Sequence, residues 1–567
     1  MTAVRSVAAA SCLILALACS SSKPDSAVKK DNAMRTGSET LIVGGTVLAG
    51  AAQRPDPNIA ILVRDGVIAQ IGDAARMRAN FPSARVIDAS RYTILPGLTD
   101  AHGHLYSLGA ALDTVDLVGA TTYDEVIARV RERASAHPGQ WVEGRGWDQN
   151  RWPGKQFPTA APMDAAVSDA PVWIRRVDGH AGLANSAAMR AAGVTASTPD
   201  PEGGRIIRDP AGQPTGVFVD TAIALIDRAV PKASPSLVKS RVLRAAQAIA
   251  AQGLTEMHDA GADDETIYAV QELIDEHRFP IRVYMMLSDD DKHSVSPRLR
   301  QWFARKPLLG YGGRLTIRSV KLYADGALGS RGAALLETYS DDPGNRGLTI
   351  SSPEHIESVA AAARAAGFQV NTHAIGDRGV RNVIDAYERA GVSAADRFRI
   401  EHLQIISPVD LPRLSQHGII ASMQPTHATS DMYWAEARIG PDRIKGAYAW
   451  RSVLDSGARL ALGSDFPIES VNPFFGIYAA VTRQDQKAYP EGGWYPKERL
   501  TLAEAIRGFT SDAAFAAFEE STRGTIEPGK MADFTIVDRN PYDTPAAELF
   551  KLQPVFTIVA GEVVYSK

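Results

Sequence analysis

Short β-type runs alternate with helical patterns along the middle of the chain. Apolar and β-branched runs lie at residues 92–95, 254–258, 281–287, 315–323, 369–373, 398–402, 419–423 and 459–463. Apolar residues recur at helical spacing between them, for example at 236–252, 353–366 and 377–390. Eight strands that alternate with helices predict an α/β fold, a parallel (β/α)8 barrel of the TIM type whose site lies at the carboxyl ends of the strands.

The two ends of the chain share a different pattern. Short β-rich runs separated by turn residues lie at 41–47, 58–64 and 67–71, and again at 531–537 and 555–564. Neither end has enough apolar residues to form a core alone. We therefore predict one small composite β-sandwich built from residues 39–95 and 524–567, with the barrel occupying residues 96–523.

One interval between strands is too long for the barrel pattern. A strand–helix unit needs roughly 30 residues, yet about 160 separate the first β-type run from the second. The surplus predicts an insertion at residues 105–235. Because it follows the first strand, it emerges on the catalytic face, where it could form a lid.

The amino-acid composition limits the ligands and metal sites that the chain can use. The 61 basic and 65 acidic residues are mixed along the chain and give a formal net charge of −4, which does not favour nucleic-acid binding. Cys12 and Cys19 are the only two cysteines. A disulfide framework and a thiolate metal site are therefore excluded, so a metal ion must use His, Asp, Glu or Lys.

The first residues resemble an export signal. Residues 1–18 combine a positive charge, a short apolar run and a small-residue cleavage site, and residues 19–38 are typical of a flexible tether. Cys19 at the junction predicts lipidation and a cell-envelope lipoprotein on the periplasmic face, although Ala16 departs from the usual aliphatic residue. The alternative is simple cleavage after Ala18, which gives a periplasmic or secreted enzyme. We expect membrane contact only through the lipid.

Polar residues gather where the predicted strands end. His102 and His104 are two residues apart, so a strand directs both to the same face. Lys321, His373, His402 and Asp465 lie at the ends of later strands. Since the carboxyl ends of barrel strands converge, these side chains predict one metal centre.

Several motifs surround these residues. They read LPGLTDAHGH at 95–104, GWDQNRW at 146–152, DGHAGLAN at 178–185, GLTEMHDAG at 253–261, KLYADGALGSR at 321–331, MQPTHATS at 423–430 and LGSDFP at 462–467. With these motifs the chain resembles the amidohydrolase superfamily, and within it the YtcJ-like, N-substituted formamide deformylase-like branch of metal-dependent hydrolases. The resemblance covers nearly the whole mature chain.

The resemblance implies a site with two metal ions, and zinc is the metal expected. His102, His104 and Asp465 would hold one ion, His373 and His402 the other, and a carbamate on Lys321 would bridge them. A single ion beside an unmodified Lys321 is the alternative, because the branch is not uniform.

The resemblance also implies roles for residues around the metal. Asp465 would take the proton of a metal-activated water and pass it to the leaving amine. The further catalytic candidates are His180 and His258, and the substrate-binding candidates are Trp147, Asp148, Arg331 and His427.

The function predicted is an exported, metal-dependent hydrolase that cleaves a non-peptide C–N bond in a small-molecule substrate, with N-substituted and N-acyl amides first. Alternatives on the same barrel are a cyclic amide hydrolase, an ester hydrolase or a deaminase, since these reactions share metal-activated water. An alternative of another class is a catalytically silent, envelope-tethered binding protein. A homodimer is the simplest expectation for assembly.

Overall fold

The computed structural model describes residues 39–50, 56–149, 152–176, 181–201, 204–220, 222–289, 291, 294–329 and 331–567. The predicted signal segment, the tether, the lipidation site Cys19 and the catalytic candidate His180 lie outside the described residues. Among the helices described, none is both long enough and apolar enough to span a bilayer.

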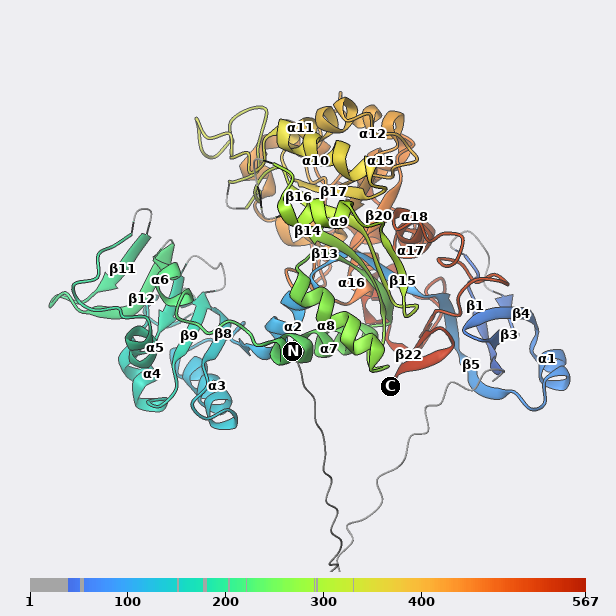
Figure 1. Cartoon of the computed structure of the whole chain (residues 1–567), viewed down its shortest axis with the longest axis horizontal. Helices are drawn as coiled ribbons and strands as arrows, with labels where there is room; N and C mark the ends of the chain where they lie inside the picture. Colours follow the sequence, from blue (N-terminus) through green and yellow to red (C-terminus); the bar gives the residue numbers. More distant parts are fainter. Residues whose placement is uncertain are drawn as a thin grey trace, which may run out of the picture.

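Eight parallel strands form a nearly closed barrel in the centre of the molecule (Figure 1). They are β6 (Leu98–Gly103), β13 (Leu254–Ala262), β14 (Arg282–Ser288), β16 (Leu315–Tyr323), β17 (Gln369–Ala374), β18 (Arg399–His402), β19 (Ile420–Met423) and β20 (Leu460–Leu462). The short β15 (Leu308–Tyr311) pairs antiparallel with β16. Just past β20, Asp465 N donates to His102 O across 2.7 Å, which joins the last strand to the first. The predicted α/β barrel is confirmed.

The first barrel strand differs from the prediction. Residues 92–95 belong to β5 (Arg85–Pro96), a strand of the composite sheet, and the barrel begins at β6 after Gly97. All six residues of β6 are buried, although they include Thr99, Asp100 and His102. The apolar run at 92–95 predicted the first barrel strand one segment too early, because β6 carries polar side chains that serve the site and lacks the apolar run expected of a buried strand.

Helices follow the strands and begin at recognisable caps. At the start of α7, the Ser234 hydroxyl oxygen accepts a hydrogen bond from the backbone N–H of Leu237. At the start of α8, the Asp263 carboxylate accepts one from the backbone N–H of Thr266. The main helices of this layer are α7 (Pro235–Ala251), α8 (Asp264–Asp275), α9 (Pro297–Phe303), α10 (Pro353–Ala365), α11 (Asp377–Arg389), α12 (Leu411–His417), α13 (Pro425–Asp431), α14 (Ala435–Arg443), α15 (Trp450–Asp455), α16 (Pro473–Thr482), α17 (Leu502–Gly508) and α18 (Ser511–Ala516).

Strands from both chain ends share a second sheet of eight strands, beside the barrel in Figure 1. Its order is β23-β22-β21-β5-β1-β3-β4, with β2 paired to β1. The bounds are β1 (Thr40–Val47), β2 (Asp56–Pro57), β3 (Ile59–Arg64), β4 (Val67–Asp73), β21 (Phe534–Val537), β22 (Pro554–Val559) and β23 (Glu562–Ser566). The ends meet where β21 runs antiparallel to β5, with Thr535 opposite Leu95. The shared sheet supports the composite element, and its two-layer form stays a prediction.

A third sheet forms a separate module between β6 and β13. Its order is β11-β12-β10-β9-β8-β7, and α3 (Tyr123–Ala136), α4 (Ala160–Ala166), α5 (Ser186–Ala191) and α6 (Ile223–Asp227) accompany it. The strands are β7 (Val115–Asp116), β8 (Val142–Trp147), β9 (Val172–Arg176), β10 (Ala181–Ala184), β11 (Gly204–Arg208) and β12 (Pro214–Asp220). The module has its own core, built around Trp147 and Trp173.

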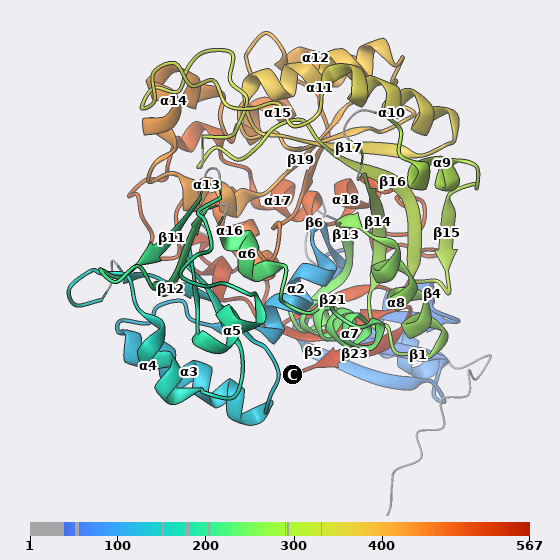
Figure 2. The same ribbon diagram turned by 60° about the vertical axis from the view of Figure 1, so that its left-hand side comes forward.

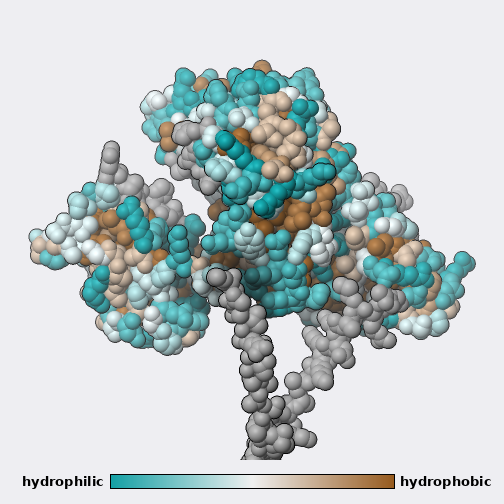
Figure 3. All heavy atoms as spheres, viewed as in Figure 1, coloured by the Kyte–Doolittle hydropathy of each residue, from teal (hydrophilic) through white to brown (hydrophobic). Residues whose placement is uncertain are grey.

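The inserted module begins later than the predicted boundary. Helix α2 (Leu105–Asp113) packs so closely on α7 that a Cβ at Gly109 would lie 2.2 Å from the Arg241 carbonyl oxygen, which places α2 in the barrel's helical layer. Figures 1 and 2 show the module beside the barrel, linked to it through α2 and α7. Figure 3 shows hydrophilic residues over most of this face, with hydrophobic ones gathered mainly in the middle of the molecule. The action of the inserted module as a lid stays a prediction.

Candidate metal centre

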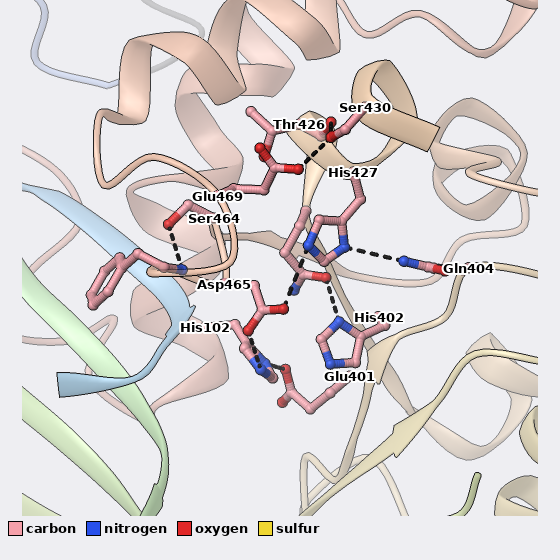
Figure 4. A network of polar contacts seen from close by, with 12 residues as sticks. His102, Glu401, His402, Gln404, Thr426, His427, Ser430, Ser464, Asp465 and Glu469 are labelled. Carbon is pink, nitrogen blue, oxygen red and sulfur yellow. Dashed lines mark hydrogen bonds and ion pairs between the residues drawn. The ribbon is translucent and has the colours of Figure 1, made fainter. Parts of the chain in front are cut away.

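The ends of β6 and β20 bring together three predicted ligands, of which Figure 4 shows His102 and Asp465. His102 ends up on the same face as His104, with ring centroids 5.6 Å apart, as the two-residue spacing requires. The Asp465 Oδ1 atom lies 3.0 Å from His104 Nε2 and 3.5 Å from His102 Nε2. These two imidazoles and one carboxylate could hold a divalent ion.

A second group shares the same carboxylate. The candidate donor atoms of His402, His427 and Asp465 lie within 4.8 Å of one another. The His402 ring is 4.6 Å from the ring of His102 and 4.6 Å from that of His373, measured between centroids. The predicted ligands from β17 and β18 therefore join those from β6, and Asp465 stands between the two groups.

Lys321 comes from β16 and is almost completely buried. Its Nζ atom lies 3.3 Å from His102 Nε2, which places the amine at the edge of the cluster. Burial lowers the pKa of Lys321 to about 8, although the carboxylates of Glu401 and Asp465 oppose that shift. A larger share of the amine is therefore neutral near pH 7 than for an exposed lysine.

Hydrogen-bond partners at Nδ1 orient the rings of His102 and His402. The Nδ1 of His102 faces Glu401 Oε2 at 2.5 Å, and the Nδ1 of His402 faces Gln424 Oε1 at 2.8 Å. An acceptor at Nδ1 fixes the proton there and leaves the Nε2 lone pair toward the cluster, as in metal-binding histidines.

Sequence reasoning missed Glu401, Gln404 and Gln424. Glu401 and His402 are adjacent, and an ordinary strand would send them to opposite faces. His402 instead has a φ of 73°, and both side chains are buried beside His102. The only sequence signal for Glu401 was an acidic residue within a buried strand.

The charges at the site suit a cation. Burial lowers the pKa of His373 to about 3 and holds the pKa values of His102 and His402 well below the ordinary range, so these rings are neutral. Burial alone would raise the pKa of Asp465, but His104 and His427 outweigh it and hold this pKa well below the usual range. Neutral imidazoles around an ionised carboxylate are the protonation states that metal binding needs.

His427 joins the cluster from α13, which follows β19. Its Nε2 atom lies 3.5 Å from Asp465 Oδ2, so the residue predicted to contact substrate stands directly at the shared carboxylate. Burial opposes a charge on this ring, but contact with Asp465 raises the pKa of His427 to about 9.

His258 lies deeper in the barrel than the cluster. Its Nδ1 contacts Arg399 Nη1 at 2.9 Å, and its ring lies 5.3 Å from that of Tyr284. Burial, with Arg399 second, holds the pKa of His258 well below its ordinary value. The structure therefore puts His258 among the polar residues that fill the barrel, and a catalytic role for it stays a prediction.

The remaining substrate candidates have partners of their own. Trp147 is fully buried in the core of the inserted module, where its Nε1 donates to Ile174 O across 3.0 Å. Asp148 pairs with Arg176 at 2.8 Å. Arg331, in the segment after β16, is held by both carboxylate oxygens of Asp341 at 3.1 and 3.0 Å. The substrate contacts of these three residues stay predictions.

The buried donor set fits a divalent metal ion. Among the described residues, His373 Nε2 is a buried nitrogen without a hydrogen-bond partner. Such atoms are costly to leave unpaired in a protein interior. Nitrogen and carboxylate donors of this kind suit zinc and similar divalent ions.

Known proteins share this architecture. An uncharacterised metal-dependent hydrolase from Pyrococcus horikoshii OT3 superposes with a TM-score of 0.76 at 26% identity, over 90% of this chain and 99% of that one. The N-substituted formamide deformylase of Arthrobacter pascens is 29% identical, over 90% of this chain and 95% of the relative.

A further relative has higher identity. The putative amidohydrolase YtcJ of Bacillus subtilis is 32% identical over 524 residues, which cover 90% of this chain and 97% of the relative. Residues 85–565 match the amidohydrolase family, a span that includes the barrel, the histidine cluster and the returning strands of the composite sheet. The chain therefore belongs to the amidohydrolase family of hydrolases that act on carbon–nitrogen bonds.

Proposed function

We propose that this protein hydrolyses a non-peptide C–N bond in an N-substituted or N-acyl amide, using water activated by metal ions. The observation that carries the proposal is the sharing of Asp465 between two imidazole groups, His102 with His104 and His402 with His427. The formamide deformylase relative supports the amide class, because the similarity spans most of both chains.

The residues of the site have two roles in the proposed reaction, metal binding and proton transfer. A divalent ion held by His102, His104 and Asp465, with His373 and His402 for a second ion, would supply Lewis acidity, which lowers the pKa of water and polarises a carbonyl oxygen. Asp465 is held ionised by His104 and His427, so it can accept the proton of the attacking water. As the C–O bond forms and the C–N bond breaks, Asp465 returns that proton to the leaving amine nitrogen.

In more detail, we propose that the site would hold two zinc ions and that Lys321, as a carbamate, would be a ligand of both. The amine of Lys321 lies at the edge of the cluster, and its lowered pKa favours the neutral form that reacts with carbon dioxide. That reaction forms an N–C bond and releases one proton. A single ion beside unmodified Lys321 is the competing arrangement.

Metal analysis combined with a substrate panel tests the function. The purified full chain, expressed without chelator, is analysed by elemental mass spectrometry and then assayed with N-substituted formamides, N-acyl amines, lactams and esters. We expect close to two zinc ions per chain and hydrolysis fastest on the acyclic amides, with Asp465→Asn inactive. A metal-loaded chain that cleaves none of the panel would overturn the proposal, and preference for lactams would move it to cyclic amides.

We propose also that the protein is exported and anchored by a lipid at Cys19. The support is the sequence alone: a signal-like segment ends at this cysteine, followed by a serine-rich stretch. Labelled fatty acid should enter the wild-type chain and be absent from Cys19→Ser. Release of an unlabelled chain that begins at Cys19 would support simple secretion instead.

A further inference from the structure

Two glutamines face two histidines of the cluster, one through its amide oxygen and the other through its amide nitrogen. Figure 4 shows the contact between Gln404 and His427. Gln424 turns its Oε1 to His402 Nδ1 at 2.8 Å, whereas Gln404 turns its Nε2 to His427 Nδ1 at 3.1 Å. Both glutamines are almost completely buried, so solvent does not complete these contacts. Because one ring faces an amide oxygen and the other an amide nitrogen, the rings of His402 and His427 have different tautomers.

The orientation of Gln424 has a second support. Its Nε2 donates to Ser422 O across 3.4 Å, which leaves its oxygen for the ring of His402. An amide oxygen can only accept, so His402 carries its proton on Nδ1 and presents a lone pair at Nε2. That is the form of a histidine that binds a metal ion.

The Gln404 contact has the opposite consequence. An amide nitrogen can only donate, so the facing Nδ1 of His427 must be the unprotonated nitrogen. The nearby carboxylate of Asp465 favours a charged ring, but a doubly protonated ring would place an N–H against the amide hydrogens of Gln404 and lose this bond. The neutral ring then carries its single proton on Nε2, the atom that faces Asp465.

We infer that His427 is a hydrogen-bond donor to the substrate carbonyl oxygen through its Nε2–H, and that Gln404 fixes this tautomer, so His427 is not a metal ligand. This inference rests on the proposed function and deepens it.

The position of the Nε2 atom supports this role. The side chain of His427 is 10% exposed, and its Nε2 is buried without a hydrogen-bond partner among the described residues. Asp465 Oδ2 lies 3.5 Å away, which is longer than an ordinary N–H···O bond. A donor that is fixed, buried and unsatisfied is suited to an oxygen on which negative charge develops during attack.

Metal content separates a donor from a ligand. We expect His427→Ala to keep the wild-type number of zinc ions by elemental mass spectrometry, while kcat falls by about 100-fold or more with little change in KM. The matched control is His402→Ala, which should lose zinc. Loss of one ion from His427→Ala would overturn the inference, because only a ligand is needed for binding.

The tautomer can be read without any substrate. In a chain labelled with ¹⁵N-histidine, the ring signals of His427 should show the proton on Nε2, and those of His402 the proton on Nδ1. Gln404→Glu replaces the donor with an acceptor, so the proton of His427 should move to Nδ1 and kcat should fall as in His427→Ala, with zinc retained. A wild-type proton on Nδ1 of His427 would overturn the inference.

These readouts separate the inference from the proposed function. If the wild-type chain hydrolyses no amide, the proposed function fails, and the metal content of His427→Ala and the ring signals still decide whether His427 is a donor or a ligand.

Discussion

His102 donates its Nδ1 hydrogen to Glu401 across 2.5 Å and so joins the first and sixth strands of the barrel. Burial raises the pKa of Glu401, while the charges of Arg399 and Lys321 oppose the shift. Arg399 stands two residues before Glu401 on β18, on the same face of that strand. The carboxylate therefore holds the His102 ring with Nε2 toward the cluster.

Removing the charge of Glu401 should weaken metal binding. In Glu401→Gln, the bond to His102 loses its ionic character, so the ring is held less firmly and its Nε2 becomes less basic. We expect affinity for zinc to fall by about 10- to 100-fold, measured by competition with a chromogenic chelator. The control is Glu548→Gln, a partly exposed side chain that pairs with Arg539. Equal zinc affinity in both variants would contradict the role of Glu401.

Lys321 should decide how many ions the site holds. If its amine bridges two ions as a carbamate, Lys321→Ala should lose at least one zinc ion per chain and nearly all activity. The control is Lys239→Ala, whose amine pairs with Glu272 and Glu276 at the surface. Retention of the full metal content in Lys321→Ala would place the lysine outside the coordination sphere.

The barrel and its principal side chains could be predicted because both depend on local spacing. Alternating strands and helices identify the fold, and strand ends converge in any parallel barrel. His102 and His104 reach one face because they are two residues apart. The structure brings these two, Asp465 and His402 together from segments that are far apart in sequence.

The supporting contacts could not be predicted, because they depend on backbone details. Glu401 and His402 both reach the site only because φ at His402 is 73°. The opposite senses of Gln404 and Gln424 are set by amide orientation, which no spacing rule describes. Trp147 suggested a pocket wall because it lies in a motif, but its ring fills the core of the inserted sheet.

We expect Trp147 to stabilise the inserted module. Trp147→Ala removes a fully buried ring that packs 5.9 Å from Trp152 between centroids, and such changes cost about 3–5 kcal/mol. We expect faster hydrogen exchange within residues 115–220, measured by mass spectrometry, with the zinc content unchanged. Trp173→Phe, in the module's other core cluster, is a milder comparison. A higher KM for Trp147→Ala with unchanged exchange would instead support a substrate contact.

The ion pair between Arg282 and Asp533 should make stability depend on pH. It joins the barrel strand β14 to the residue before β21, with Arg282 Nε 2.8 Å from Asp533 Oδ2 and both side chains buried. Burial alone would raise the pKa of Asp533, but Arg282 outweighs it and lowers this pKa below the ordinary value. The folded state thus binds the Asp533 proton less tightly than the unfolded state, whose pKa is about 3.9.

The contribution of Asp533 to stability is therefore fully present above pH about 4 and is lost as the pH falls through its folded pKa. Asp533→Asn leaves Arg282 buried without its carboxylate, so we expect a loss of about 3–5 kcal/mol at pH 7. Urea unfolding at pH 7, 5, 4 and 3 should show this difference shrinking only below pH about 4. Asp442→Asn, at an exposed surface pair, should change little at any pH. A difference between wild type and Asp533→Asn that persists undiminished at pH 3 would mean that the carboxylate stabilises the joint by packing or hydrogen bonding, without its charge.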